Sequence, residues 1–233
     1  MMLGKEKLYQ YIKKFGFGEK TGIDLPGEMA GYIRPTQKWS GTSIGAIPIG
    51  QEVAVTAIQV LRAYSVIANG CYLVKPFVVS EIRSSEGNIL YKAVIQREKI
   101  VSEKTTKIMR DILKKVTEEG GTATQAKLDG NNVAGKTGTA QKYDPKTGRY
   151  SKDRFVSSFV GFIPADNPRI AMIVVIHDPK GAHYGGVVAA PVFKAISDEA
   201  MAYLNIPRDD AKEKGLVVTF ENETNRKVVV AKE

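Results

Sequence analysis

The segment from Gly130 to Gln141 constrains the fold more than any other part of this chain, because it fits two motifs that need different backbones. Its sequence, GNNVAGKTGTAQ, has at residues 130–137 the spacing G-x-x-x-x-G-K-T of a phosphate-binding P-loop. Residues 136–138 also form the Lys-Thr-Gly element of serine acyl-transfer enzymes. A P-loop joins a buried strand to a helix, whereas the second motif needs an extended strand beside a cleft.

The neighbouring residues favour the strand. Residues 120–129 before the motif are polar and lack an apolar β-branched run, so they do not predict a buried strand. After Lys136, Gly138, Pro145 and Gly148 oppose a helix, because glycine and proline are the poorest helix formers. A P-loop nucleotide-binding protein therefore remains only a remote alternative.

Three successive segments predict an antiparallel sheet. They are residues 133–141, 154–163 and 169–176, and the last two are rich in β-branched and aromatic residues and bounded by prolines. Short connections between consecutive strands are typical of antiparallel pairing.

Helical periodicity appears before and after these strands. We predict helices over residues 8–15, 52–69, 102–120 and 190–204, and a hairpin that pairs 77–82 with 89–91. Residues 21–42 are predicted as a loop in which Trp39 anchors packing. Helices combined with one antiparallel sheet predict an α+β sandwich.

Composition excludes several classes. The net charge is +9, but the lysines and arginines are scattered without an aromatic-interleaved cluster, so no nucleic acid is expected. The longest apolar run, residues 170–176, is far shorter than the roughly 20 residues of a membrane span. There is no signal-peptide pattern.

Cys71, the only cysteine, is predicted to be a small buried residue. His177 and His183 are predicted to lie in a loop and not to bind metal, and no cofactor is expected.

The C-terminal end differs in composition from the rest. Residues 208–214 are charged and predicted to form a linker, and residues 216–220 and 227–231 are predicted to pair as a small hairpin. We therefore divide the chain into a domain over 1–207 and a tail over 208–233.

Several blocks in a fixed order resemble a known family. Besides the Lys-Thr-Gly-Thr run, they include FGFG at 15–18, TGIDLPGE at 21–28, IGQE at 49–52, GGTA at 120–123, SFVGFIP at 158–164 and GGVVAAPVF at 185–193. In this order they resemble the C-terminal part of the transpeptidase domain of class B penicillin-binding proteins. The resemblance implies a penicillin-binding, serine β-lactamase-like fold. It also implies a D,D-transpeptidase that crosslinks peptidoglycan stem peptides and binds β-lactams, in elongation, division or sporulation.

The resemblance also implies a role for each residue of the motif. Lys136 and Thr139 are expected to be catalytic, Lys136 beside the proton network and Thr139 through a backbone N–H in the oxyanion hole. Thr137, Gly138 and Thr139 are expected to bind substrate. Gly121 and Thr122 are expected to border the same cleft.

Two elements of this chemistry are absent. None of the eleven serines has lysine three residues later or asparagine two residues later, so the chain carries neither S-x-x-K nor S-x-N. By resemblance both belong before Leu3, and we expect an N-terminally incomplete, inactive domain. Its parent is expected to be membrane-anchored at the extracytoplasmic face of the bacterial inner membrane and to meet other cell-wall synthesis or division proteins through the missing part. The alternative is a non-catalytic docking domain.

Overall fold

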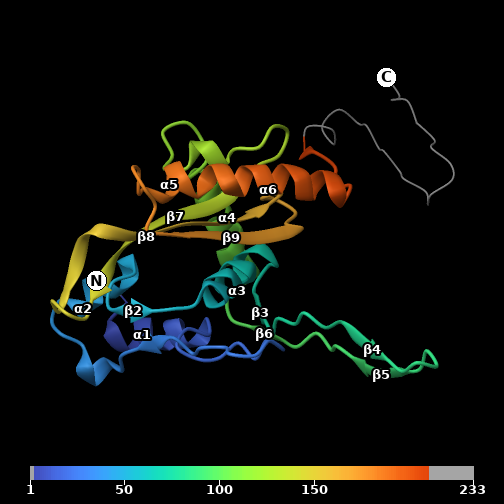
Figure 1. Ribbon diagram of the computed structural model, residues 1–233, viewed down its shortest axis with the longest axis horizontal. Helices are drawn as coiled ribbons and strands as arrows, with labels where there is room; N and C mark the ends of the chain where they lie inside the picture. Colours follow the sequence, from blue (N-terminus) through green and yellow to red (C-terminus); the bar gives the residue numbers. More distant parts are fainter. Residues whose placement is uncertain (1–2, 210–233) are drawn as a thin grey trace. The chain divides into compact units, whose positions relative to one another are not determined.

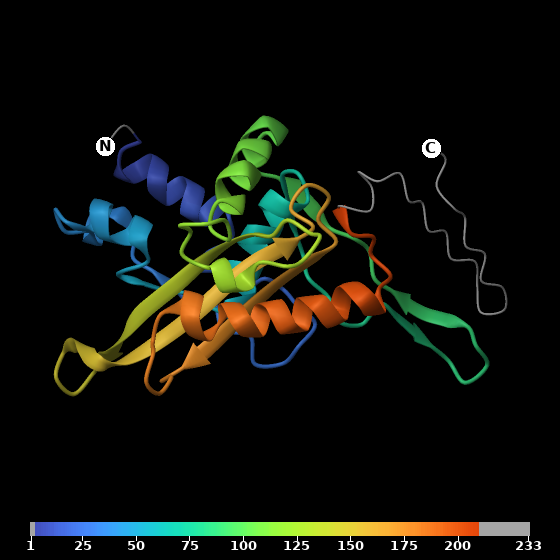
Figure 2. The same cartoon turned by 90° about the horizontal axis from the view of Figure 1, so that it is seen from above.

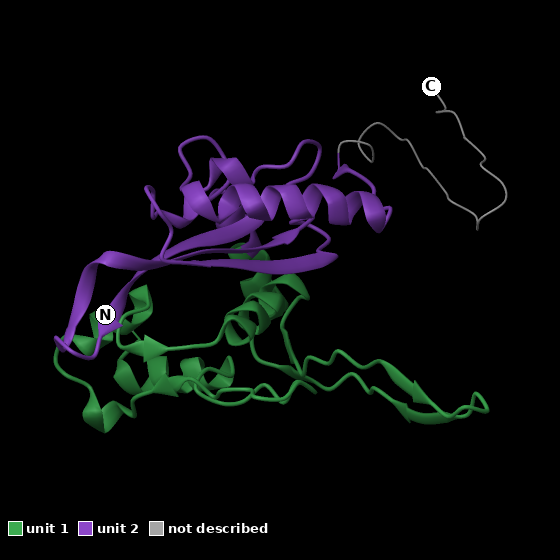
Figure 3. Ribbon diagram, in the orientation of Figure 1, with its two compact units in different colours: residues 1–109 green, residues 110–233 purple. Residues whose placement is uncertain are grey.

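The computed structural model describes residues 3–209, and the predicted tail hairpin lies outside them. The chain divides into two compact units, residues 1–109 and 110–233, coloured separately in Figure 3. The predicted domain boundary at residue 207 stays a prediction. None of the helices in the described part of the chain is long and apolar enough to cross a membrane.

Unit 1 contains small helices and three two-stranded sheets. Strands β1 and β2, β3 and β6, and β4 and β5 pair antiparallel. A small core of Val66, Leu73 and Ile100 lies under Phe15 and Val101. The elements are α1 (Lys5–Lys14), β1 (Tyr32–Ile33), η1 (Thr36–Lys38), α2 (Ser43–Ala46), η2 (Ile47–Ile49), β2 (Val53–Ala54), α3 (Ala57–Ala68), β3 (Tyr72–Val74), β4 (Glu81–Arg83), β5 (Ile89–Lys92) and β6 (Arg97–Lys99).

Helix α4 (Glu103–Lys114) runs across the boundary between the units. Unit 2 then contains η3 (Thr124–Ala126), β7 (Ala134–Asp144), β8 (Arg149–Ile163), β9 (Ile170–His177), α5 (Gly185–Val188) and α6 (Ala190–Tyr203). The three strands form one antiparallel sheet in the order β7-β8-β9. The predicted α+β fold with three consecutive antiparallel strands is therefore confirmed.

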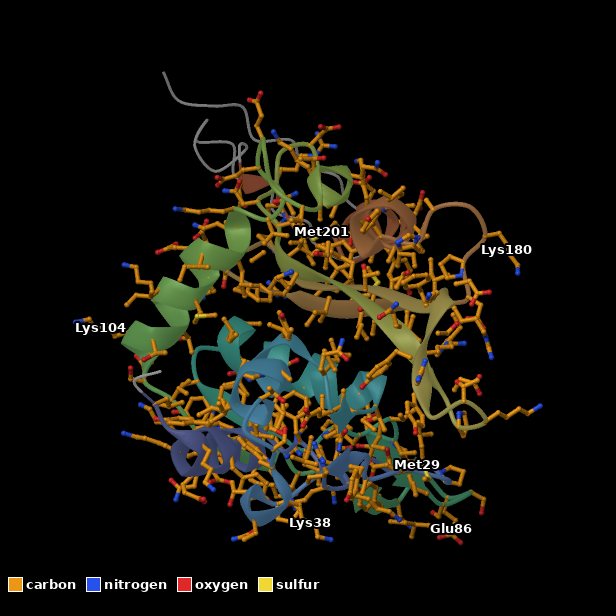
Figure 4. The ribbon with its side chains drawn as sticks, turned by 90° about the vertical axis from the view of Figure 1, so that its left-hand side faces the viewer. Met29, Lys38, Glu86, Lys104, Lys180 and Met201 are labelled. Atoms are coloured by element: carbon orange, nitrogen blue, oxygen red, sulfur yellow. The ribbon has the colours of Figure 1, made fainter. Side chains whose placement is uncertain are left out.

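Helices α5 and α6 lie over this sheet, as Figures 1 and 2 show from two directions. Every second residue of β8 points toward the helices, and the core between the helices and the sheet is apolar. Phe159 is fully buried and meets Phe193 of α6 edge-on, with ring centroids 4.8 Å apart. Met201, labelled in Figure 4, belongs to the same core.

Two predicted helix boundaries were wrong. The helix predicted to begin at Glu52 begins at Ala57, because Val53 and Ala54 pair with β1 and Thr56 then caps the helix. Thr56 Oγ1 accepts from Gln59 N, and the Gln59 side chain accepts from Thr56 N, which completes a capping box.

The helix predicted over 102–120 ends at Lys114. Ser102 caps its start as expected, through a bond from Thr105 N to Ser102 Oγ. At the other end the buried Thr117 donates its hydroxyl to Val133 O at 3.1 Å, which turns the chain toward β7.

Two further expectations differ from the structure, since the loop predicted over 21–42 contains β1 and η1, and the strand predicted over 77–82 is observed as β4 at Glu81–Arg83. Cys71 is fully buried, and Trp39 donates its indole N–H to Arg34 O and meets Tyr9 edge-on. His183 lies outside the helices and strands, but His177 is the last residue of β9, so its prediction as a loop residue was wrong.

Candidate functional site

The Lys-Thr-Gly-Thr run lies in the middle of β7, which is an edge strand of the sheet of unit 2. Lys136 faces Val160 of β8, and Thr139 faces Ser157. The strand continues past Lys136 to Asp144 and no helix begins there, so the backbone that a P-loop requires is not formed.

A hydroxyl pair joins β7 to the loop before η3. Thr137 Oγ1 and Thr122 Oγ1 share a hydrogen bond of 3.2 Å. Lys136 Nζ donates to the same Thr137 Oγ1 at 3.2 Å and to Thr137 O at 3.0 Å. Among the residues that the structure describes, Lys136 has no carboxylate within 4.0 Å. An exposed ammonium beside two hydroxyl groups therefore forms a site that suits an anion.

The start of α5 packs against β7 and against the loop before η3. Gly185 N donates to Thr139 Oγ1 at 3.1 Å. A Cβ at Gly185 would lie 2.2 Å from Ser158 O and 2.6 Å from Gly138 O, and one at Gly186 would lie 2.0 Å from Thr122 O. The glycine pair thus lets α5 approach the backbone of β7, β8 and the Thr122 loop together.

Gly138 and Gly121 are glycines for different reasons. A Cβ at Gly138 would lie 2.5 Å from Ser158 Oγ, its partner on β8, so glycine makes room for that hydroxyl. A Cβ at Gly121 would lie 2.4 Å from Val116 O, so this glycine serves the turn after α4.

The outer edge of β7 pairs with no other strand in the described part of the chain. Thr137 O receives the bond from Lys136 Nζ, which indicates that this carbonyl points away from β8. In an antiparallel strand the N–H and C=O of one residue point to the same side, and this side alternates from residue to residue. The N–H of Thr139, two residues later, therefore also points away from β8, along the edge that Lys136 borders.

Two ion pairs connect the strands at one end of the sheet. Asp178 Oδ2 accepts from Lys142 Nζ of β7 at 2.6 Å and from Arg154 of β8 at 3.0 Å. The hydrogen bonds from Arg154 and Lys142 lower the pKa of Asp178 to about 2. Nearby, His183 stacks on Phe155 with ring centroids 4.1 Å apart. These contacts fix the loop that carries Gly185.

The structure thus gathers most of the predicted site residues around β7. Thr122, Lys136 and Thr137 are linked by hydrogen bonds, and Thr139 is bonded to the first residue of α5. The contact of Gly185 and Gly186 with the motif was not predicted from the sequence. The one feature of the sequence that could have indicated this contact is the pair of adjacent glycines before the last predicted helix. Within residues 3–209, no group of three or more His, Cys, Asp or Glu side chains is arranged to hold a metal ion.

Comparison with known proteins agrees with this geometry. The family model described as "Penicillin binding protein transpeptidase domain" matches residues 1–198. Stage V sporulation protein D of Bacillus subtilis is 40% identical over 216 residues, which cover 91% of this chain and 33% of that protein. Peptidoglycan D,D-transpeptidase FtsI of Escherichia coli is 32% identical over 204 residues, which cover 87% of this chain and 32% of that protein.

Solved structures show the same fold. The crystal structure of penicillin binding protein 3 from Mycobacterium tuberculosis, complexed with aztreonam, matches with a TM-score of 0.82 and 34% identity over 88% of this chain and 48% of that chain. The chain spans about a third of the length of the curated relatives given above. The sequence, the fold and these matches together show that the chain belongs to the family of penicillin-binding protein transpeptidase domains.

Proposed function

We propose that this chain supplies the Lys-Thr-Gly wall of a peptidoglycan D,D-transpeptidase. The observation that carries the proposal is the outer edge of β7, where the Lys136 ammonium, the Thr137 hydroxyl and the outward N–H of Thr139 lie on the side that no described strand pairs with. The family matches support the same chemistry.

Each group has a role in binding a stem peptide that ends in D-alanine. Lys136 and the hydroxyls of Thr137 and Thr139 bind the terminal carboxylate, because a cation and neutral donors together favour an anion. Thr139 Oγ1 already accepts from Gly185 N, so its own proton is directed to another acceptor. Thr122 holds the Thr137 hydroxyl in place from the other side.

The backbone N–H of Thr139 contributes to the oxyanion hole. The nucleophilic serine attacks the carbonyl of the penultimate residue, and the negative charge on that oxygen grows only in the transition state. A donor placed for it is worth about 3 kcal/mol. Because no serine in this sequence has lysine three residues later, the nucleophile and its base come from outside these 233 residues.

The same proposal covers ligands and location. β-Lactams occupy the cleft in place of the stem peptide, and the domain works at the extracytoplasmic face of the inner membrane. The crystal structures of the Mycobacterium tuberculosis relative with aztreonam and with ampicillin support the first point for that protein.

A chimera tests the proposal. Residues 3–207 replace the matching segment of the Mycobacterium tuberculosis penicillin binding protein 3, which keeps that protein's own upstream part. The chimera is expected to form a covalent adduct with fluorescent penicillin, and the 233-residue chain alone is not. A folded chimera that stays unlabelled, or an isolated chain that becomes labelled, would contradict the proposal.

A further inference from the structure

The loop between β9 and α5 brings one donor to the Lys-Thr-Gly strand. Gly185 N, where α5 begins, donates to Thr139 Oγ1 at 3.1 Å. The middle of the loop has little support, because Lys180, Gly181 and Ala182 are exposed. Lys180, labelled in Figure 4, projects away from the sheet. The position of Gly185 N therefore depends on α5 and on what holds the residues directly before it.

A buried serine of β8 holds that part of the loop. Ser157 is fully buried and donates its hydroxyl to His183 O, two residues before Gly185. The His183 ring also stacks on Phe155 of the same strand, with ring centroids 4.1 Å apart. His183 is therefore fixed to β8 through both its backbone carbonyl and its ring.

Ser157 and Thr139 bond to this loop from the same face of the sheet. The two residues are directly opposite each other in the register of β7 and β8, so their side chains lie on one face. One hydroxyl bonds to His183 O and the other to Gly185 N. Ser157, Thr139 and residues 183–185 thus close a ring of contacts, in which Ser157 fixes the loop at the height where Gly185 N reaches Thr139 Oγ1.

We propose that Ser157 is a positioning residue of the transpeptidase site, which acts through His183 and Gly185 on the Thr139 hydroxyl. The inference rests on the proposed function, in which that hydroxyl binds the terminal carboxylate of the substrate. Because Thr139 Oγ1 accepts from Gly185 N, its own proton is directed to another acceptor. Without the Ser157 bond the loop moves away, the hydroxyl loses this orientation, and the carboxylate of a stem peptide or a β-lactam is bound less tightly.

Burial of a serine does not by itself indicate such a role. Ser197 of α6 is also fully buried in unit 2, but its hydroxyl has no hydrogen-bond partner in the described part of the chain. Ser157 differs because its hydroxyl bonds to a residue 26 positions later in the chain. Ser197→Ala therefore removes the same buried atom as Ser157→Ala but breaks no bond, which makes it the matched control.

Amide hydrogen exchange in the full 233-residue chain, followed by NMR, tests the contact itself. Ser157→Ala is expected to speed exchange of the Gly185 N–H at least about tenfold, because the loop opens more readily without its anchor. Ser197→Ala is expected to change this rate less than about twofold. Circular dichroism checks folding, and Ser157→Cys, which keeps the size and a weak donor, is expected to give an intermediate rate. Gly185 exchange that is unchanged in the folded Ser157 variants overturns the proposal.

A double-mutant cycle in the chimera that carries residues 3–207 tests the effect on the site. Ser157→Ala is expected to slow acylation by fluorescent penicillin about fivefold, mainly by raising the penicillin concentration at half-maximal rate. In the Thr139→Ala background it is expected to have no further effect, because it acts only through that hydroxyl. An equal loss in both backgrounds indicates a purely structural role and contradicts the proposal. If Lys136→Ala leaves the rate unchanged, the proposed function itself fails; if Lys136→Ala slows the reaction and Ser157→Ala does not, only the role of Ser157 fails.

Discussion

Replacing Gly185 by alanine places a methyl group against the backbone of two strands. The new Cβ would lie 2.2 Å from Ser158 O and 2.6 Å from Gly138 O. The first distance is roughly 1.3 Å short of the 3.5 Å at which non-bonded atoms attract. Neither carbonyl belongs to a flexible side chain, so α5 has to move away from the sheet.

The cost has two parts. Overpacking of a well-packed region costs about 1–3 kcal/mol. Moving α5 also breaks the bond from Gly185 N to Thr139 Oγ1, which contributes about 1 kcal/mol. We expect Gly185→Ala to lower the free energy of unfolding of unit 2 by about 2–4 kcal/mol.

Urea denaturation of the 233-residue chain, followed by circular dichroism, measures this cost. Gly41→Ala is the control, because a Cβ there meets nothing within 4 Å and its φ is not in the left-handed region. The control is expected to stay within about 0.5 kcal/mol of the parent. If Gly185→Ala unfolds at the same urea concentration as the parent, the close approach of α5 to β7 is refuted.

Three further predictions concern other sites. Gln59 is 1% exposed and donates to Glu19 O and Ala30 O. Gln59→Leu is therefore expected to lower the free energy of unfolding of unit 1 by about 3 kcal/mol in urea denaturation. The control, Gln37→Leu at an exposed position, is expected to lower it by less than about 0.5 kcal/mol. Asp178 has a pKa lowered to about 2, so its stabilising effect is complete above its ordinary value of 3.8 and is lost as pH falls toward 2. An acid titration of Asp178→Asn is therefore expected to lose less stability between pH 4 and 2 than the parent; an unchanged curve contradicts the ion pairs. Burial raises the pKa of Tyr64 to about 12, so Tyr64→Phe is expected to remove part of the stability loss above pH 10, measured by thermal unfolding.

The sheet of unit 2 was predictable because its strands have the residue composition that is typical of strands. Residues 154–163 and 169–176 are apolar and β-branched, and β8 and β9 contain almost the same residues. The first five residues of β8 were missed, because Arg149–Asp153 is polar and becomes a strand only by pairing with the end of β7. Propensity does not reveal such tertiary pairing.

The helix errors have the same origin. Residues 52–56 continue the apolar pattern of α3, but Val53 and Ala54 pair with Ile33 and Tyr32, which lie about 20 positions earlier. The capping box of Thr56 and Gln59 was visible in the sequence and marks the true start.

The motif itself was predictable, but its surroundings were not. Lys136, Thr137 and Thr139 form a local run, whereas Gly185 lies 46 residues after Thr139 and meets it only in the folded sheet. The pairing of Thr122 with Thr137 likewise depends on the turn after α4. Single-sequence patterns report spacing along the chain and not which distant backbones approach each other.

The rate of acylation by fluorescent penicillin, measured in the Mycobacterium tuberculosis chimera, tests the proposed role of β7 most directly. Lys136→Ala is expected to lower the rate constant about 100-fold, which corresponds to about 3 kcal/mol. Lys146→Ala, a lysine in the turn beyond β7, is the matched control and is expected to leave the rate unchanged. Equal rates for the parent chimera and the folded Lys136→Ala variant would contradict a role for the Lys-Thr-Gly edge in the reaction.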